Sequence, residues 1–146
     1  MDALVADQHA LRRLALAATA LDVIGARIAV PRGLVGEPLL ISVPAELPAG
    51  VVLAGWGTAL SAPLLMDGAL GALSLAGDSR GATSRAVRAL GMLRLVGVLV
   101  EPVTWGRRAP RWAMLISVGH VAIAASLIRQ AGRPPARPFR STTEAP

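Results

Sequence analysis

The chain has 146 residues, of which 53% are hydrophobic and 16% are charged, and its mean hydropathy is +0.55. A water-soluble domain carries about 25% charged residues, so this composition is typical of a protein in lipid, and the length allows one domain. The formal net charge is +6 and there is no cysteine, which excludes disulfides, thiol catalysis and thiolate metal sites.

The first apolar segment, residues 14–30, lies in a helix expected over about residues 10–30 and contains Asp22 and Arg27. A secretory signal peptide has a basic start and an unbroken apolar core. Here two aspartates precede the segment and Asp22 interrupts it. We therefore expect a helix that stays in the membrane.

The second segment is the most apolar, because residues 47–66 contain no charged residue. It is predicted as one helix over about residues 49–77, with Trp56, Pro63 and Asp67 on one stripe. The preceding loop holds four prolines and cannot be a long helix. A row of small residues beside the stripe is suited to close helix packing: Gly68, Ala72 and Ala76.

The third segment is expected to be helical over about residues 84–105. Arg94 and Glu101 are seven positions apart, so they share one face of the helix, roughly 10.5 Å apart along its axis. A central arginine costs about 2.5–3.5 kcal/mol in lipid, so this helix needs the shelter of other helices. Pro102 predicts a kink and a free carbonyl at Val98.

The fourth helix is expected over about residues 111–129, and only His120 within residues 112–128 is ionisable. The remaining residues, 131–146, form a basic, proline-rich tail that is expected to be disordered. The predicted fold is all-α: an integral membrane bundle of four transmembrane helices within residues 1–130. Nine arginines then lie on the cytoplasmic side and five outside, which favours an N-in/C-in orientation.

Ionisable side chains from all four helices fall at membrane depth. The predicted spans place Asp22, Arg94 and His120 near the midplane, Glu101 in the outer half and Asp67 in the inner half. Arg94 is expected to pair with Asp22 or Asp67. Three carboxyl groups face one arginine, so at least one carboxyl group is expected to keep its proton.

These residues suggest a cofactor-independent membrane enzyme doing acid–base chemistry on a lipid-soluble, isoprenoid-like substrate (cyclisation, isomerisation or epoxide opening). The candidate catalytic residues are Glu101, Asp67, Asp22 and His120. The candidate substrate-binding residues are Arg94, Trp105 and Trp56. Two alternatives remain open: a proton-coupled transporter or channel subunit, and a non-catalytic scaffold in which the charges only hold helices together.

No cofactor or metal site is expected, since no phosphate-binding or dinucleotide motif is present and the chain has two histidines and no cysteine. The arginines lie at the ends of apolar segments and not among stacking aromatic residues, so nucleic acid is not an expected partner. The expected partners are membrane lipids and a lipid-soluble small molecule, with a homo-oligomer possible. Lysine, asparagine and tyrosine are missing, which indicates a GC-rich bacterium and hence its plasma membrane.

Overall fold

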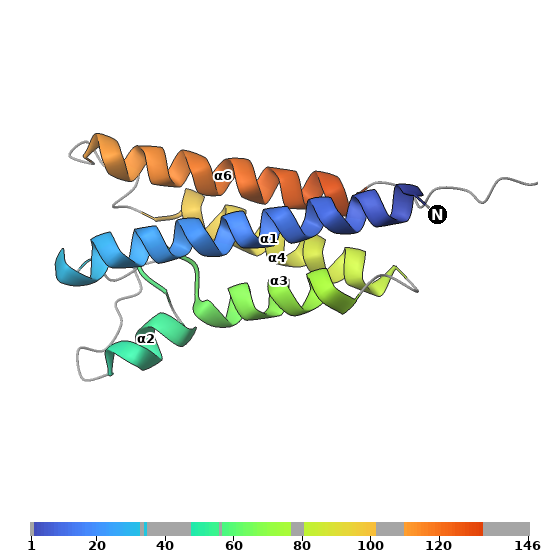
Figure 1. The fold of residues 1–146 in the computed structure, drawn as a ribbon. Helices are drawn as coiled ribbons and strands as arrows, with labels where there is room; N and C mark the ends of the chain where they lie inside the picture. The colour runs from blue at the N-terminus through green and yellow to red at the C-terminus, as the bar shows by residue number, and fades with distance from the viewer. Residues whose placement is uncertain are drawn as a thin grey trace, which may run out of the picture.

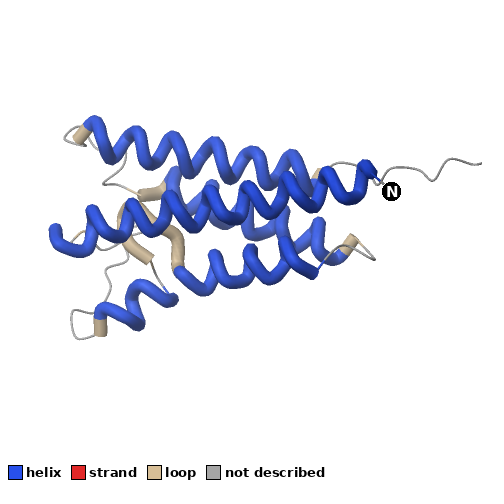
Figure 2. The backbone as a smooth tube through the Cα atoms, viewed as in Figure 1, coloured by secondary structure: helices blue, strands red, loops and turns tan. Residues whose placement is uncertain are grey.

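The computed structural model describes residues 2–32, 34, 48–55, 57–76, 81–101 and 110–132. Most of these residues are helical and none of them lies in a β-strand, which confirms the all-α class (Figure 2). The elements are α1 (Asp2–Ala29), the short 3-10 helix η1 (Val30–Arg32), α2 (Ala49–Gly55), α3 (Leu64–Ala76), α4 (Ala82–Leu99) and α6 (Arg111–Ala131).

Four of the helices pack side by side. Helix α4 packs most extensively on α6, while α1 contacts both α3 and α6, and α3 contacts α4. Helices α1 and α4 run in one direction and α3 and α6 in the other (Figure 1). The start of α1 and the end of α6 therefore lie at the same end of the molecule.

The single helix predicted over residues 49–77 is wrong, because the structure has two helices separated by a turn. Gly57 adopts a φ of 82°, a left-handed conformation that a right-handed helix cannot contain. Thr58 and Ser61 then pair through their backbones, with N···O distances of 3.1 and 3.2 Å. Pro63 has no N–H and stands just before α3, where a proline is tolerated. We call residues 57–63 the interrupting turn.

Helix α4 ends at Leu99, before the end predicted for it at residue 105. Glu101 precedes a proline in the sequence, and a residue before proline avoids the helical conformation. The predicted helical stripe from Arg94 to Glu101 therefore leaves the helix before Glu101. Trp56, Pro102 and Trp105 lie outside the described residues.

The interior contains two apolar clusters with a polar layer between them. One cluster lies toward the start of α1 and the other toward its end. On α1, Asp22 falls between Ala18 of the first cluster and Ala29 of the second. On α6, His120 falls likewise between Leu127 and Ile116. Ionisable groups thus occupy the middle of the molecule, not its ends.

Two helical stretches in the described residues are long and apolar enough to cross a membrane, Gln8–Arg32 and Arg111–Ala131. Helix α3 is apolar but has 13 residues, about 20 Å, whereas the bilayer core is about 30 Å thick. By this criterion the described part of the chain holds two of the four predicted spans.

The row of small residues on α3 does not pack against another helix of this chain as expected. Gly68, Ala72 and Ala76 are all exposed, and a Cβ atom on Gly68 would meet nothing within 4 Å. Helix α3 packs instead through Leu70 and its neighbours. Close glycine contacts between helices lie elsewhere: a Cβ on Gly119 of α6 would lie 2.9 Å from Leu21 on α1, and a Cβ on Gly91 of α4 would lie 3.0 Å from Ile128 on α6.

Candidate functional site

The centre of the polar layer is the guanidinium group of Arg94. Helix α4 buries Val87, Gly91 and Arg94 along one face, so the arginine points inward. Its Nη2 atom lies 2.6 Å from Oδ2 of Asp22 on α1 and 2.6 Å from Oδ1 of Asp67 on α3. The predicted pairing of Arg94 with an aspartate is confirmed, and both candidate aspartates take part. One side chain therefore ties three helices together.

His120 joins α6 to this network through both ring nitrogens. Its Nδ1 lies 3.2 Å from Nη1 of Arg94, and its Nε2 lies 3.0 Å from the carbonyl oxygen of Leu60. Arginine only donates and a carbonyl only accepts, so Nδ1 accepts and the Nε2–H group donates. This assigns a neutral imidazole. Oδ1 of Asp22 lies 3.7 Å from Nε2.

The interrupting turn is fixed to the helices from two sides. Oδ1 of Asp22 accepts a hydrogen bond from the backbone N–H of Ala62, and His120 donates to Leu60. Gly25 of α1 allows this contact, because a Cβ atom there would overlap the carbonyl oxygen of Leu60. The turn thus obtains from side chains the backbone partners that an unbroken helix would have supplied.

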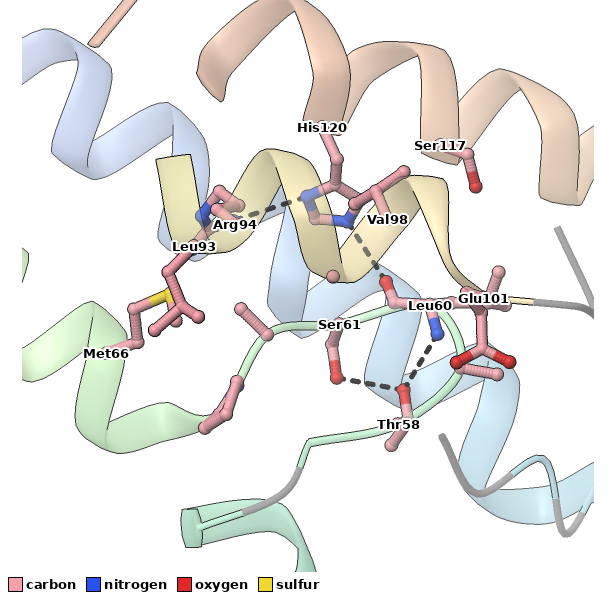
Figure 3. A pocket seen from close by; sticks show the side chains of 14 residues that line it. Thr58, Leu60, Ser61, Met66, Leu93, Arg94, Val98, Glu101, Ser117 and His120 are labelled. Atoms are coloured by element: carbon pink, nitrogen blue, oxygen red, sulfur yellow. Dashed lines mark hydrogen bonds between the residues drawn. The ribbon is translucent and has the colours of Figure 1, made fainter. Parts of the chain in front are cut away.

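A pocket of about 90 Å³ lies between the interrupting turn, α3, α4 and α6 (Figure 3). Its polar side chains come from three parts of the chain. The turn contributes Thr58 and Ser61, whose hydroxyl oxygens are 2.8 Å apart. The other lining residues are Ala59, Leu60, Ala62, Pro63, Met66, Leu93, Arg94, Gly97, Val98, Glu101, Ser117 and His120.

Glu101 lines this pocket, whereas Asp22 and Asp67 do not. Its side chain is buried although it follows the end of α4, and in Figure 3 its carboxyl group lies on the same side of the pocket as Thr58. The predicted carboxyl groups thus divide in two. Asp22 and Asp67 bind the arginine, and Glu101 faces the space where a ligand would fit.

The described residues of the site carry more acid than base. Asp22 and Asp67 are buried with one guanidinium, and the neutral His120 adds no charge. With both aspartates ionised, these four side chains would hold one net negative charge in a medium that penalises it. A proton or a bound cation would reduce this excess.

Sequence reasoning missed the contribution of the interrupting turn. The helix predicted over residues 49–77 includes the whole turn. In such a helix, the backbone of Leu60 and Ala62 and the hydroxyl groups of Thr58 and Ser61 could not form this wall of the pocket. The signal was present in the two glycines and the proline at positions 55, 57 and 63. Among the described residues no group of three or more histidine, aspartate or glutamate side chains is arranged to hold a metal ion.

Trp56 and Trp105, the two candidate aromatic substrate contacts, lie outside the described residues. Trp112 on α6 stacks with Arg32, whose guanidinium carbon is 5.5 Å from the ring centroid. This contact lies at the end of the molecule away from the start of α1. Comparison with family models, curated proteins and solved structures finds no match to this chain.

Proposed function

We propose that the protein is an integral membrane protein that crosses the bilayer four times, with α2, the interrupting turn and α3 together forming the second crossing. The distribution of side chains supports this. Leu16 and Leu115 are 72% and 73% exposed, whereas the carboxylate-bearing Asp22 is 1% exposed. Only 28% of the apolar window of α1 and 33% of that of α6 are buried. Helices that are apolar outside and charged inside match lipid as their surroundings.

The exposed arginines support the same proposal and an N-in/C-in orientation. Exposed arginines lie on both sides of the polar layer. On the side toward the start of α1 they are Arg13, Arg85, Arg88 and Arg129, and on the other side they are Arg27, Arg32 and Arg111. This leaves the middle of the exposed surface apolar, with cations at the two levels where lipid headgroups would lie. The larger arginine count expected on the side of both termini makes that side cytoplasmic.

Within this architecture we propose that the protein moves protons and a small solute across the membrane, as a transporter or channel subunit. The observation that carries the proposal is the pocket at the interrupted crossing, which Glu101 lines. Non-helical backbone at membrane depth is tolerated where it lines a cavity, and secondary transporters place solute and coupling-ion sites at such interruptions. Glu101 is the group that takes up and releases the proton.

Catalysis on an isoprenoid-like substrate fits the geometry less well. That hypothesis requires two carboxyl groups converging on one apolar pocket, whereas Glu101 is the one carboxyl group among the described lining residues and Asp22 and Asp67 bind Arg94. The volume of about 90 Å³ is also well below the roughly 300 Å³ at which ligand pockets begin. The enzyme hypothesis therefore stays a prediction, ranked below transport.

The test is proton flux in sealed vesicles. The full chain is reconstituted into liposomes that contain a pH-sensitive dye, and a membrane potential is imposed with potassium and valinomycin. We expect protons to enter faster than in protein-free vesicles, and we expect Glu101→Gln to return the rate to the protein-free level. The control is Arg88→Gln, which removes an exposed charge and should leave the rate unchanged. Equal rates with and without protein would contradict the proposal.

A further inference from the structure

We infer that Asp22 and Asp67 share one proton, so that the cluster around Arg94 is a proton-binding site separate from the pocket. The inference goes beyond the proposed function and does not depend on it. Both aspartates are buried, with exposed fractions of 1% for Asp22 on α1 and 6% for Asp67 on α3. Each has a carboxyl oxygen 2.6 Å from Nη2 of Arg94, so the two groups are direct neighbours around one nitrogen atom.

One oxygen of each aspartate has no hydrogen bond. Oδ1 of Asp22 accepts from the N–H of Ala62, and Oδ1 of Asp67 accepts from Nη2 of Arg94. The two Oδ2 atoms are buried and have no hydrogen-bond partner in the described part of the chain. The two carboxyl groups are within hydrogen-bonding reach of each other. A single proton therefore gives both Oδ2 atoms a partner, because a protonated carboxyl group donates and a carboxylate accepts.

The charge of the cluster favours a proton as well. Arg94 carries one positive charge, and the hydrogen bonds of His120 assign it a neutral ring. Two ionised aspartates would leave one net negative charge in the interior, where a charge without a counter-charge is strongly penalised. Neither the interrupting turn nor α2 contains a charged residue. Arg12 of α1 contacts α3 about two turns away, at the carbonyl oxygen of Ser74. One proton brings the cluster to zero charge.

Asp67 is the member of the pair that carries the proton. Asp22 has several donors around it, because it accepts from Ala62, lies 2.6 Å from Nη2 of Arg94 and lies 3.7 Å from Nε2 of His120. Donors stabilise the ionised form of a carboxyl group. Among the described residues, Asp67 has one donor, Nη2 of Arg94. The proton therefore belongs to Oδ2 of Asp67, which donates to Oδ2 of the Asp22 carboxylate.

A shared proton makes the stability of the protein depend on pH in a defined direction. An aspartate in the unfolded chain is ionised at neutral pH, whereas the folded protein keeps one proton on the pair. The folded protein then binds one proton more than the unfolded chain, so its stability falls as the pH rises until that proton is lost. After the loss, two carboxylates on α1 and α3 repel each other around one guanidinium.

Infrared spectroscopy of the purified full-length protein tests the inference, because a protonated carboxyl group has a carbonyl stretching band that a carboxylate lacks. At neutral pH we expect such a band in the unmodified protein and its loss in Asp67→Asn. Asp22→Asn should lose it too, since either variant leaves one carboxylate for one guanidinium. Glu101→Gln should keep it. A band that is absent from the unmodified protein, survives either aspartate substitution or disappears in Glu101→Gln would overturn the inference.

The pH dependence of unfolding in sodium dodecyl sulfate is a second measurement, and it needs only Asp67→Asn, in which a neutral amide replaces a neutral carboxyl group. While the folded protein holds the shared proton, the equilibrium constant of unfolding should rise with pH more steeply in the unmodified protein than in this variant, by about tenfold per pH unit. The control Arg88→Gln removes an exposed charge and should keep the steeper dependence. Parallel profiles for Asp67→Asn and the unmodified protein would overturn the inference. Neither measurement involves proton flux, so the inference and the proposed function fail separately.

Discussion

Nη2 of Arg94 lies 2.6 Å from Oδ2 of Asp22, and both side chains are buried where four segments of the chain meet. Breaking a buried ion pair from one side leaves an uncompensated charge in a low-dielectric interior. We expect Arg94→Met to lower the free energy of unfolding by about 3–5 kcal/mol, or to prevent folding. Unfolding in detergent with increasing sodium dodecyl sulfate, followed by circular dichroism, measures this loss.

The matched control is Arg88→Met on the same helix. Arg88 is exposed, and substitutions at such positions change stability by about 0.5 kcal/mol or less. Similar losses for the two variants would show that the aspartates do not depend on Arg94.

The two aspartates on Arg94 should not be equivalent. Asp22 contacts Arg94 and also accepts a hydrogen bond from the N–H of Ala62 in the interrupting turn, whereas Asp67 accepts a hydrogen bond from Arg94. Asp67→Asn leaves one carboxylate for one guanidinium, so we expect the free energy of unfolding to change by about 1 kcal/mol or less. Asp22→Asn also disturbs the turn and should cost more, about 1–3 kcal/mol. The same unfolding assay measures the loss of stability in both variants. A larger loss for Asp67→Asn than for Asp22→Asn would contradict this order.

The sequence allowed the all-α class and the Arg94–aspartate pairing to be predicted, because a charge inside an apolar helix must find a partner at its own depth. It did not reveal the interrupting turn. Hydropathy adds up side chains and is insensitive to the backbone, so an uncharged stretch with Gly57 and Pro63 scored as one helix. Because the turn was not predicted, the contacts of His120 and Asp22 with it could not be predicted either.

The position of small residues was misjudged for a related reason. In a helix with apolar residues all around, periodicity does not distinguish the inward from the outward face. Gly68 was expected to contact a helix and is exposed, while Gly25 and Gly91 make the close contacts. Only the arrangement of neighbouring helices decides which glycine is needed.

Gly25 gives a prediction about the turn. A methyl group at this position would overlap the carbonyl oxygen of Leu60 and lie 2.8 Å from its carbonyl carbon. Neither backbone atom can move without displacing the wall of the pocket. We expect Gly25→Ala to destabilise the protein by about 1–3 kcal/mol. Gly68→Ala has open space and should be neutral or stabilising by up to about 1 kcal/mol. Equal behaviour of the two variants would contradict the tight packing of α1 on the turn.

The orientation can be tested with single cysteines, since the natural chain has none. Arg13→Cys lies in the first half of α1 and Arg111→Cys at the start of α6, on opposite sides of the polar layer that holds Asp22 and His120. Both positions are exposed. In intact cells of a bacterial host, we expect a membrane-impermeant maleimide to label position 111 and not position 13, and to label both after the membrane is opened. Labelling of position 13 alone in intact cells would reverse the proposed orientation.

A substitution at Gly97 can test the pocket without lowering the stability of the protein. It lines the pocket, and a Cβ atom there would meet nothing within 4 Å, so a side chain has room to enter the pocket without displacing a helix. A leucine side chain would occupy much of the volume of about 90 Å³. We expect Gly97→Leu to fold normally, with an unfolding midpoint equal to or above that of the unmodified protein because leucine favours helix over glycine. The same variant should lose proton flux. Normal proton flux in a folded Gly97→Leu protein would show that protons do not pass through this pocket.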